Sequence, residues 1–367
     1  MGNIAVIGAG PAGLAAAKMA AQQGMKVTLW EKGIIGAGIR CAEGYFDFLG
    51  LLAPPGAGIK YKVQGICFHA NKEYYLAGEH LRIWMIDRSV WQQYMAREAV
   101  NNGVELREKV RISPQDLISL QKEYDWVIDA SGVPPVSARV YGFSDFYLPH
   151  SLVTAQYTVE GDFTYLQDQI KIGIDPGYFG YYWVFPKGEN VANVGIALLP
   201  ATSATRDTKA LWPLVDKILV KENLVGAKVL KRCGGLCPAK VLPRLVWDNL
   251  ILVGDAAGLC SPLHGGGIDR ALVSGEQAIT AICTGNVNAY REKLQDIFGK
   301  CFRLETRLVD IWSRSSFAEM ERLIAGISAF SHGNRINALL PLSRGLLQRA
   351  YYFLDFWQAL QGKHSLQ

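Results

Sequence analysis

A glycine-rich turn between a buried strand and a helix constrains this chain more than any other feature of its 367 residues. Residues 3–7 (NIAVI) form an apolar, β-branched run that is typical of a buried parallel strand. The turn that follows reads Gly8-Ala9-Gly10-Pro11-Ala12-Gly13, and an Ala-rich helix is predicted from Leu14 to Gln23. A second strand is predicted from Lys26 to Trp30 and ends at Glu31. This order predicts the first βαβ unit of a parallel sheet.

Each part of this unit matches what a dinucleotide requires. Gly8 allows the tight turn, Gly10 lets a pyrophosphate approach the backbone, and Gly13 permits close packing of helix on strand. The N-terminus of the helix offers free N–H groups and a partial positive charge to the phosphates. Glu31 is placed to accept hydrogen bonds from an adenosine ribose. The unit therefore predicts a dinucleotide site.

A second motif distinguishes FAD from a nicotinamide dinucleotide. The predicted strand Asn249–Val253 is followed by the sequence GDAAG, in which Asp255 can bond a ribityl hydroxyl that NAD lacks. Gly265 to Gly267 then open a helix that is predicted to run from Ile268 to about Cys283. The backbone N–H groups of such an N-terminus stabilise the negative charge of a reduced flavin. Both halves of the chain therefore predict FAD.

Two shorter signals support this prediction. Arg88 lies in a DRxxW motif before an amphipathic helix predicted from Val90 to Asn101. The turn Ala130-Ser131-Gly132 follows a predicted strand, Trp126–Asp129, and is expected near the pyrophosphate. Residues 140–250 contain no second GxGxxG on a strand–helix pair, so we expect no separate nicotinamide-binding domain.

Composition excludes several other classes of protein. Half of the residues are hydrophobic and 19% are charged, which excludes a disordered chain. The 38 Lys and Arg against 33 Asp and Glu give a net charge of +5, which is too small to indicate nucleic-acid binding. The N-terminus lacks a secretory pattern, and no segment of about 20 residues is free of charge, Gly and Pro. We expect a cytoplasmic protein without a metal site, because its seven cysteines match no zinc or iron–sulfur pattern.

Taken together, the motifs resemble the geranylgeranyl reductase family, within the superfamily of para-hydroxybenzoate-hydroxylase-like flavoproteins. GAGPAG (8–13), DRxxW (87–91) and GDAAG (254–258) mark only the superfamily. The stretch YYWVFPKGENVANVG (181–195) is more specific to the reductases. The loop RCAEG (40–44) is similar to the RCGEG loop of the archaeal lipid reductases, although it has Ala42 where that branch has Gly. The resemblance covers residues 1 to about 285.

The resemblance implies a reaction and its partners. In this family, reduced FAD delivers a hydride from N5 to one carbon of a prenyl C=C bond, and a proton reaches the other carbon. An unactivated alkene must be held close to the flavin with water excluded, which favours an apolar tunnel. The implied substrate is a geranylgeranyl lipid or related isoprenoid, the electron donor is NAD(P)H or ferredoxin, and peripheral contact with the cytoplasmic face of a membrane is permitted. The predicted cofactor-binding residues are Gly8, Gly10, Pro11, Ala12, Gly13, Glu31, Lys32, Arg40, Cys41, Arg88, Val110, Ala130, Ser131, Gly132, Gly254, Asp255, Pro262, Gly265, Gly266, Gly267 and Ile268.

We predict a mixed α/β protein (α+β overall) with three parts. The discontinuous FAD-binding, Rossmann-like domain comprises residues 1–59, 86–150 and 245–285. An antiparallel-sheet substrate domain comprises residues 60–85 and 151–244, where strand-like alternation recurs. Residues 286–367 are expected to be helical.

The aromatic residues of the reductase-specific stretch are candidates for a substrate channel. On a strand, Tyr181, Trp183 and Phe185 point to one side. Together with Pro186 they either form a wall of the prenyl channel or belong to the core of the sheet.

Three side chains are candidates for the proton donor. Cys41, in a loop expected near the flavin, is either a proton donor or a small buried thiol. Glu43 is the rival source, and His264 either shuttles a proton or bonds the backbone. The pair Cys233 and Cys237 is expected to serve packing or, alternatively, to form a reversible disulfide.

The C-terminal region contains one amphipathic helix with two interpretations. It is predicted between Pro341 and Leu360, and its apolar stripe consists of Leu346, Leu347, Ala350, Tyr351, Leu354 and Trp357. The helix either docks on the FAD domain or forms an interfacial helix or lid over a lipid tunnel.

Two other functions remain open at this point. A flavin-dependent monooxygenase, hydroxylase or halogenase acting on an aromatic or polyketide-like substrate shares the superfamily motifs, although the WxWxIP motif of halogenases is absent from the sequence. A non-catalytic FAD-binding protein is the third interpretation.

Overall fold

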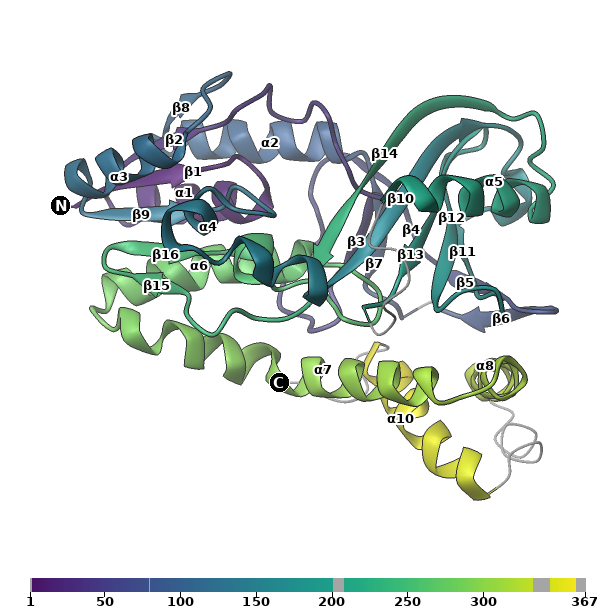
Figure 1. Cartoon of the computed structure of the whole chain (residues 1–367). Helices are drawn as coiled ribbons and strands as arrows, with labels where there is room; N and C mark the ends of the chain where they lie inside the picture. The colour runs from purple at the N-terminus through teal and green to yellow at the C-terminus, as the bar shows by residue number, and fades with distance from the viewer. Residues whose placement is uncertain (1, 79, 201–207, 333–343, 361–367) are drawn as a thin grey trace.

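The computed structural model describes residues 2–78, 80–200, 208–332 and 344–360 (Figure 1). The strands are β1 (Asn3–Ile7), β2 (Lys26–Trp30), β3 (Gly44–Phe46), β4 (Ile59–Lys62), β5 (Gly65–His69), β6 (Glu73–Ala77), β7 (Ile83–Ile86), β8 (Glu105–Arg107), β9 (Trp126–Asp129), β10 (Ser151–Glu160), β11 (Gln169–Gly173), β12 (Gly180–Gly188), β13 (Val191–Leu198), β14 (Lys228–Pro238), β15 (Val246–Trp247) and β16 (Leu250–Leu252). The helices are α1 (Pro11–Gln22), α2 (Arg88–Asn101), α3 (Pro114–Glu123), α4 (Val136–Tyr141), α5 (Trp212–Lys221), α6 (Ile268–Cys283), α7 (Tyr290–Ser313), α8 (Phe317–Ser331) and α10 (Arg344–Leu360).

The predicted βαβ unit forms the centre of a six-stranded sheet. Its strand order is β15-β16-β9-β1-β2-β8, and all of the pairs are parallel except β15 with β16. Parallel strands are covered on both faces, which explains why Ile4 and Val6 of β1 are fully buried. Helix α1 ends at Gln22, and Gly24 just beyond it adopts the left-handed conformation that terminates helices. The α/β prediction is confirmed.

Close packing of α1 on α6 joins the two halves of this domain. A Cβ atom on Gly275 of α6 would collide with the carbonyl oxygen of Ala12 in α1. Helix α6 begins at Ile268, directly after the predicted glycine triplet. The two glycine motifs, which are far apart in sequence, are therefore brought to the same end of the sheet.

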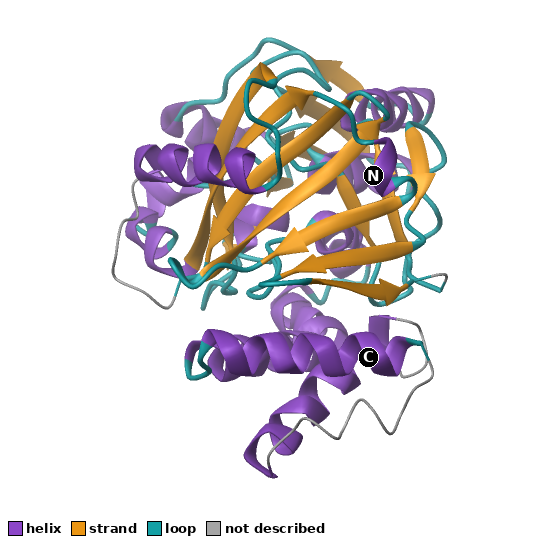
Figure 2. Cartoon of the chain, turned by 90° about the vertical axis from the view of Figure 1, so that its right-hand side faces the viewer, coloured by secondary structure: helices purple, strands orange, loops and turns teal. Residues whose placement is uncertain are grey.

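A second sheet of seven strands lies beside the first, and Figure 2 shows it with the C-terminal helices below. Its order is β14-β10-β13-β12-β11-β5-β6, and its pairs are antiparallel apart from β5 with β11. The single antiparallel sheet that the sequence predicts for this region differs from the structure in two respects. Strands β5 and β11 pair in parallel, and β4 and β7 pair with β3 in a separate three-stranded sheet, in which Tyr45 and Trp84 pack with Trp91 of α2.

Helix α7 runs from beneath α6 toward the seven-stranded sheet, below which α8 and α10 lie (Figures 1 and 2). Helix α10 contacts α7 and α8, and its Trp357 is 3% exposed within an apolar cluster that also holds Trp183 and Phe185 of β12. Its Phe356 also contacts Phe48 of the predicted FAD-binding segment 1–59, with ring centroids 6.1 Å apart. Tyr351, expected on the apolar stripe, is 66% exposed, whereas Ala350 and Trp357 are buried. The side chains of Leu346 and Leu347 lie outside the described residues.

Among the residues that the structure describes, no helix has the length and apolar character needed to cross a bilayer.

Candidate active site

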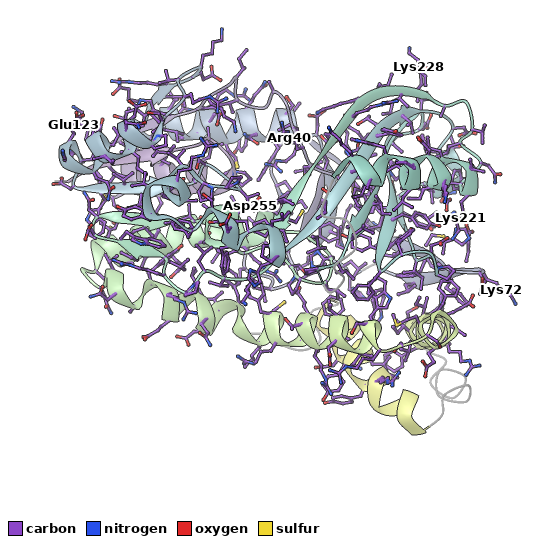
Figure 3. The ribbon with its side chains drawn as sticks, in the orientation of Figure 1. Arg40, Lys72, Glu123, Lys221, Lys228 and Asp255 are labelled. Carbon is purple, nitrogen blue, oxygen red and sulfur yellow. The ribbon has the colours of Figure 1, made fainter. Side chains whose placement is uncertain are left out.

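A cavity of about 1000 Å³ runs between the six-stranded sheet, the seven-stranded sheet and the C-terminal helices. At one end it is lined by the first glycine turn, and at the other by Trp312, Met320 and Phe353 of α7, α8 and α10. Arg40 and Asp255, which are labelled in Figure 3, both line it. A dinucleotide site and an apolar compartment are thus parts of one space.

The first glycine turn has the shape that a pyrophosphate requires. Gly8 adopts φ +100, which a side chain disfavours, and a Cβ on Gly13 would collide with the Gly8 carbonyl oxygen. In contrast, a Cβ on Gly10 would meet no atom within 4 Å. Space is therefore left open above the backbone at the position where the sequence predicts the phosphates.

The Glu31 carboxylate is fixed at the end of β2. Its Oε2 accepts a hydrogen bond of 2.9 Å from the Ala9 N–H, and its Oε1 accepts one of 2.9 Å from the Gly33 N–H. A carboxylate has lone pairs for further donors, so ribose hydroxyls can still bind. Gln92 of α2, which the sequence analysis missed, donates to the Ala9 carbonyl at 2.7 Å and stabilises the same turn.

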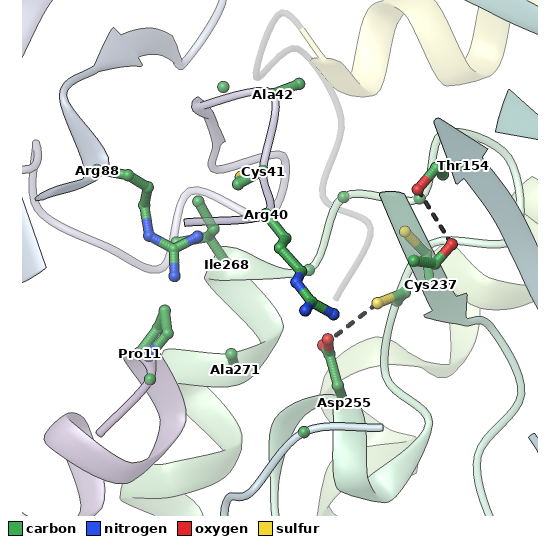
Figure 4. Close-up of a pocket in the computed structure, with 18 of the residues that line it drawn as sticks. Pro11, Arg40, Cys41, Ala42, Arg88, Thr154, Cys237, Asp255, Ile268 and Ala271 are labelled. Carbon is green, nitrogen blue, oxygen red and sulfur yellow. Dashed lines mark hydrogen bonds between the residues drawn. The ribbon is translucent and has the colours of Figure 1, made fainter. Parts of the chain in front are cut away.

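Two arginines extend into the cavity (Figure 4). The side chain of Arg40 points toward Asp255. Arg88 donates from Nη2 to Gln92 at 3.2 Å, but its Nε is buried without a hydrogen-bond partner among the described residues. A buried donor of this kind is costly unless a ligand satisfies it. The unpaired Nε of Arg88 and the open backbone at Gly10 together fit an anionic cofactor such as FAD.

The turn that contains Ser131 is held by a residue that the sequence analysis did not assign to the site. Asp129 is fully buried at the end of β9 and accepts from the Ser131 hydroxyl at 2.5 Å and from the Ser137 N–H at 2.9 Å. The Ser131 side chain is therefore engaged within the turn. Its backbone, with those of Ala130 and Gly132, lines the cavity.

The second glycine motif closes the flavin end of the cavity. Asp255 follows β16 and accepts a hydrogen bond from the Cys260 thiol at 3.3 Å, and burial raises the pKa of its carboxyl. The Tyr181 hydroxyl donates to the His264 carbonyl oxygen at 2.6 Å, so β12 of the seven-stranded sheet anchors the glycine loop. Gly265 adopts φ +65, which favours glycine there.

Most of the predicted site residues line this cavity. They are Gly8, Gly10, Pro11, Ala12, Glu31, Lys32, Arg40, Cys41, Arg88, Val110, Ala130, Ser131, Gly132, Tyr181, Trp183, Phe185, Asp255, His264, Gly265, Gly266, Gly267 and Ile268. Five do not: Gly13, Glu43, Pro186, Gly254 and Pro262. Gly13 and Gly254 instead allow the backbone to pass close to its neighbours.

Glu43 lies behind the wall of the cavity. Its carboxylate forms an ion pair of 2.5 Å with Lys187 and accepts hydrogen bonds from Asn193 at 3.0 Å and from the Arg88 N–H at 3.1 Å. The residue adopts φ +70 and is 4% exposed. These contacts fix the loop that carries Cys41 against β13 and α2.

The loop with Cys41 is also attached to the seven-stranded sheet through Gln156, which the sequence analysis missed. The Gln156 amide donates to the Cys41 carbonyl at 3.3 Å and accepts from the Trp183 indole N–H at 3.2 Å. The Cys41 sulfur accepts from the Glu43 N–H at 3.3 Å. The sequence signal that could have identified Gln156 was a polar residue at a buried position of the strand TAQYTVE.

The far part of the cavity is apolar. Tyr181, Trp183 and Phe185 of β12 face it, while the intervening Tyr182 and Val184 pack into a cluster on the other face of the sheet. The remaining apolar lining comes from several elements: Phe46, Phe48, Ile66, Phe68, Leu76, Ile83, Ile172, Ile174, Trp312, Met320, Ile324, Ile327, Phe353, Phe356 and Trp357. This end has the shape and chemistry to hold a long hydrocarbon chain.

A buried ionic group supports the glycine loop from behind. Glu305 of α7 lies 2.7 Å from Arg270 Nη2 and 3.4 Å from His264 Nε2. Burial would raise the pKa of Glu305, but Arg270 and His264 outweigh it and lower that pKa to about 2. His264 Nδ1 accepts the Gly266 N–H at 3.1 Å, so in the neutral ring Nε2 carries the proton and faces Glu305. The Nε2 atom is buried and has no hydrogen-bond partner among the described residues.

The comparisons with known proteins agree with this site. Residues 3–79 match the model of an FAD binding domain, and residues 152–235 match the geranylgeranyl reductase catalytic domain. The chain is 33% identical over 340 residues to a digeranylgeranylglycerophospholipid reductase of Methanosarcina acetivorans, covering 83% of this chain and 81% of that one. It is 29% identical to a second such reductase from Methanopyrus kandleri, with 88% and 89% covered.

Solved structures show the same fold. A geranylgeranyl bacteriochlorophyll reductase-like protein from Thermoplasma acidophilum superposes with a TM-score of 0.76 at 22% identity and covers 99% of both chains. A flavin-dependent halogenase superposes with a TM-score of 0.61 at 16% identity, covering 98% of this chain and 72% of the other.

The fold and the cavity define an FAD-dependent oxidoreductase, since the cofactor end of the cavity fits FAD and the matching models are those of flavoenzymes. Within that class, the chain belongs to the digeranylgeranylglycerophospholipid reductase family.

Proposed function

We propose that this protein reduces C=C bonds in the geranylgeranyl chains of a glycerophospholipid. The observation that carries the proposal is the continuity of the cavity from the Gly10 turn to the aromatic end formed by Trp183 and Phe356. Its substrate chemistry rests on the similarity to two relatives that are digeranylgeranylglycerophospholipid reductases. A prenyl chain is flexible and apolar, and an apolar compartment of this kind binds it while excluding water.

FAD bound in reduced form supplies the hydride for this reaction. The chain's own residues hold the cofactor and the alkene in place. Glu31 and Arg88 hold the nucleotide end, Asp255 the ribityl end, and the Gly265–Gly267 loop the ring edge. Trp183 and Phe185 form the wall against which the prenyl chain lies. Orientation of the alkene in a dry site supplies much of the rate enhancement.

Cys41 is the proposed proton donor to the second alkene carbon. Cys41 lines the cavity, whereas the Glu43 carboxylate is occupied by Lys187 and Asn193 behind the wall. His264 uses Nδ1 to accept the Gly266 N–H, and its Nε2 faces the Glu305 carboxylate. We expect Cys41→Ala to retain FAD and to lose at least about 100-fold in kcat, the low end of what a general acid contributes. Cys41→Ser should restore part of that loss. Full activity of Cys41→Ala would remove the thiol from the chemistry.

The function is tested by single turnover. The purified protein, loaded with FAD, is reduced anaerobically with dithionite, and a geranylgeranylated phospholipid is then added. Return of the oxidised flavin absorption, with a gain of two hydrogens per bond in the lipid by mass spectrometry, is the expected result. If the flavin stays reduced with lipid but reacts with air and hydroxylates or halogenates an aromatic acceptor, the monooxygenase interpretation replaces ours.

The electron donor and the membrane contact are part of the proposal. Because the chain carries one glycine-rich dinucleotide turn, we propose that NAD(P)H binds transiently or that ferredoxin delivers the electrons.

A lipid substrate must be drawn from a bilayer, and exposed Tyr351 on α10 gives that helix an aromatic side chain suited to the interface. Flotation with liposomes tests the contact: Tyr351→Glu should reduce binding while leaving FAD content unchanged.

A further inference from the structure

Two cysteines from separate segments meet in the wall of the cavity. Cys237 lies near the end of β14, and Cys260 lies in the loop between β16 and α6. The Cys260 N–H donates to the Pro238 carbonyl oxygen at 2.8 Å, which holds the two segments side by side. The neighbouring Cys237 thiol is the largest cause of the raised pKa of Cys260, and both residues line the cavity.

Both thiols lie directly behind the glycine loop at the flavin end. The position of a Cβ on Gly265 is 3.5 Å from the Cys237 sulfur, and that of a Cβ on Gly267 is 3.2 Å from the Cys260 sulfur. The Cys260 thiol also donates to Asp255 at 3.3 Å. A pair of thiols is therefore placed beside the stretch of backbone that holds the ring edge of FAD in this fold.

We propose that Cys237 and Cys260 form a reversible dithiol–disulfide couple that exchanges an electron pair with the bound FAD. The proposal rests on FAD binding and not on the identity of the lipid. It assigns to this protein a second two-electron store, so that one chain holds enough electrons to saturate two C=C bonds after a single loading.

Oxidation of the pair would break both S–H bonds and form one bond between the two sulfur atoms, and the two electrons and two protons released would convert oxidised FAD to its reduced form. Asp255 would relay the Cys260 proton toward the flavin, because its Oδ1 already receives the thiol hydrogen bond. A base is needed here, since the contact with Cys237, burial and Asp255 together raise the pKa of Cys260.

The pairing differs from the one that the sequence suggests. Cys233 and Cys237 lie four residues apart on the same strand, β14, which separates their Cα atoms by about 13 Å. A disulfide needs Cα atoms within about 7 Å, so the alternative of a Cys233–Cys237 bridge is wrong. Cys283 lies exposed at the end of α6, away from the cavity lining, and serves as a matched control.

An anaerobic reductive titration tests the proposal without any lipid. The FAD-loaded protein is first oxidised in air and then titrated with dithionite, with the flavin absorption as the indicator. We expect wild type and Cys283→Ser to consume about two equivalents per FAD, and Cys237→Ser and Cys260→Ser to consume about one. The proposal would be overturned if wild type consumed about one equivalent of dithionite per FAD. It would also be overturned if Cys283→Ser consumed as little as the Cys237 and Cys260 variants.

A second measurement decides the matter if either serine variant fails to hold FAD. Wild type with all thiols reduced is incubated anaerobically with excess oxidised FAD, alkylated, and digested for peptide mapping. We expect the peptides that contain Cys237 and Cys260 to be linked and the other cysteines to be alkylated. Alkylation of all seven cysteines, or a link between any other pair, contradicts the proposal. Failure of lipid reduction in the single-turnover experiment affects neither result.

Discussion

Among single residues, Gly10 and Gly13 allow an effect on cofactor binding to be distinguished from an effect on folding stability. A Cβ on Gly10 enters open space and its backbone is extended, whereas a Cβ on Gly13 collides with the Gly8 carbonyl. We expect Gly10→Ala to fold with unchanged stability and to lose FAD affinity at least about tenfold, because the methyl group occupies the pyrophosphate position. Gly13→Ala should lose about 1–3 kcal/mol of folding free energy. Flavin fluorescence titration and urea unfolding measure the two effects. Equal FAD affinity in Gly10→Ala and wild type would contradict the placement of the phosphates.

Neighbouring residues on β12 provide a second matched pair. Trp183 faces the cavity, and Val184 faces the cluster on the other side of the sheet. We expect Trp183→Ala to keep its FAD and to lose about tenfold or more in kcat/KM for the lipid, which is the scale of a hydrophobic pocket contact. Val184→Ala should lose about 1–2 kcal/mol of stability and keep its kinetics. Steady-state kinetics and chemical unfolding of both variants make the comparison. Unchanged lipid kinetics in Trp183→Ala would exclude it from the channel.

The sequence motifs located the site residues whose spacing along the chain defines the motif. They missed the residues whose role depends on contacts with other elements of the fold. The glycine turn, Glu31 and Asp255 were found because their spacing along the chain is itself the signal. Asp129 and Gln156 were missed because their partners lie on other elements, and no local pattern records those contacts. The same reason explains why the sequence did not bring Cys237 together with Cys260.

At the scale of elements, the contact between α6 and α7 depends on one buried ion pair. Glu305 and Arg270 are both almost fully buried, and Arg270 has Nε and Nη1 without hydrogen-bond partners among the described residues. We expect Glu305→Gln to lose about 3–5 kcal/mol, because it leaves a buried charge unpaired. The double variant Arg270→Met, Glu305→Leu should recover most of that loss. Urea unfolding at neutral pH compares the stability of Glu305→Gln with that of the double variant. A double variant as unstable as Glu305→Gln would refute this explanation.

The same pair predicts a pH dependence. The pKa of Glu305 is lowered to about 2 in the folded protein, against about 4.3 for an unfolded Glu. Its stabilising effect is therefore complete above the unfolded pKa and is lost as the pH falls toward the folded pKa. We expect the difference in unfolding free energy between wild type and Glu305→Gln to be constant from pH 7 to about 5 and to shrink below about 4.5. A difference that grows on acidification would show that another group dominates.

The helices and strands themselves were largely predictable, and their docking was not. Strand β1, helix α1 and the start of α6 lie where glycine and apolar periodicity indicated. The amphipathic stripe of α10 indicated that one face is buried, but periodicity does not say against which surface. Its actual neighbours, α7, α8 and the cluster around Trp183, are contacts of long sequence separation.

For the molecule as a whole, the closed end of the cavity sets the length of chain that fits. Phe353 and Phe356 of α10 line that end. We expect Phe356→Trp to shorten the space and shift the preference from geranylgeranyl toward farnesyl lipids, with a change in the kcat/KM ratio of about 10-fold. Phe356→Ala should move the ratio in the opposite direction. Competition between the two lipids, followed by mass spectrometry, measures the ratio, and an unchanged ratio in both variants would place the chain terminus elsewhere.

Because the two ends of one cavity differ in polarity, we expect the binding of cofactor and of lipid to have different thermal signatures. In our proposal the flavin binds at the end that contains charged side chains, whereas the prenyl chain covers aromatic and aliphatic surface. Removing that surface from water lowers the heat capacity, so the enthalpy of lipid binding becomes more negative as the temperature rises. The enthalpy of flavin binding changes less steeply, because less apolar area is covered. Binding enthalpies measured by calorimetry at several temperatures therefore give a heat-capacity change for each ligand, and this change reports the polarity of the half of the cavity that the ligand covers.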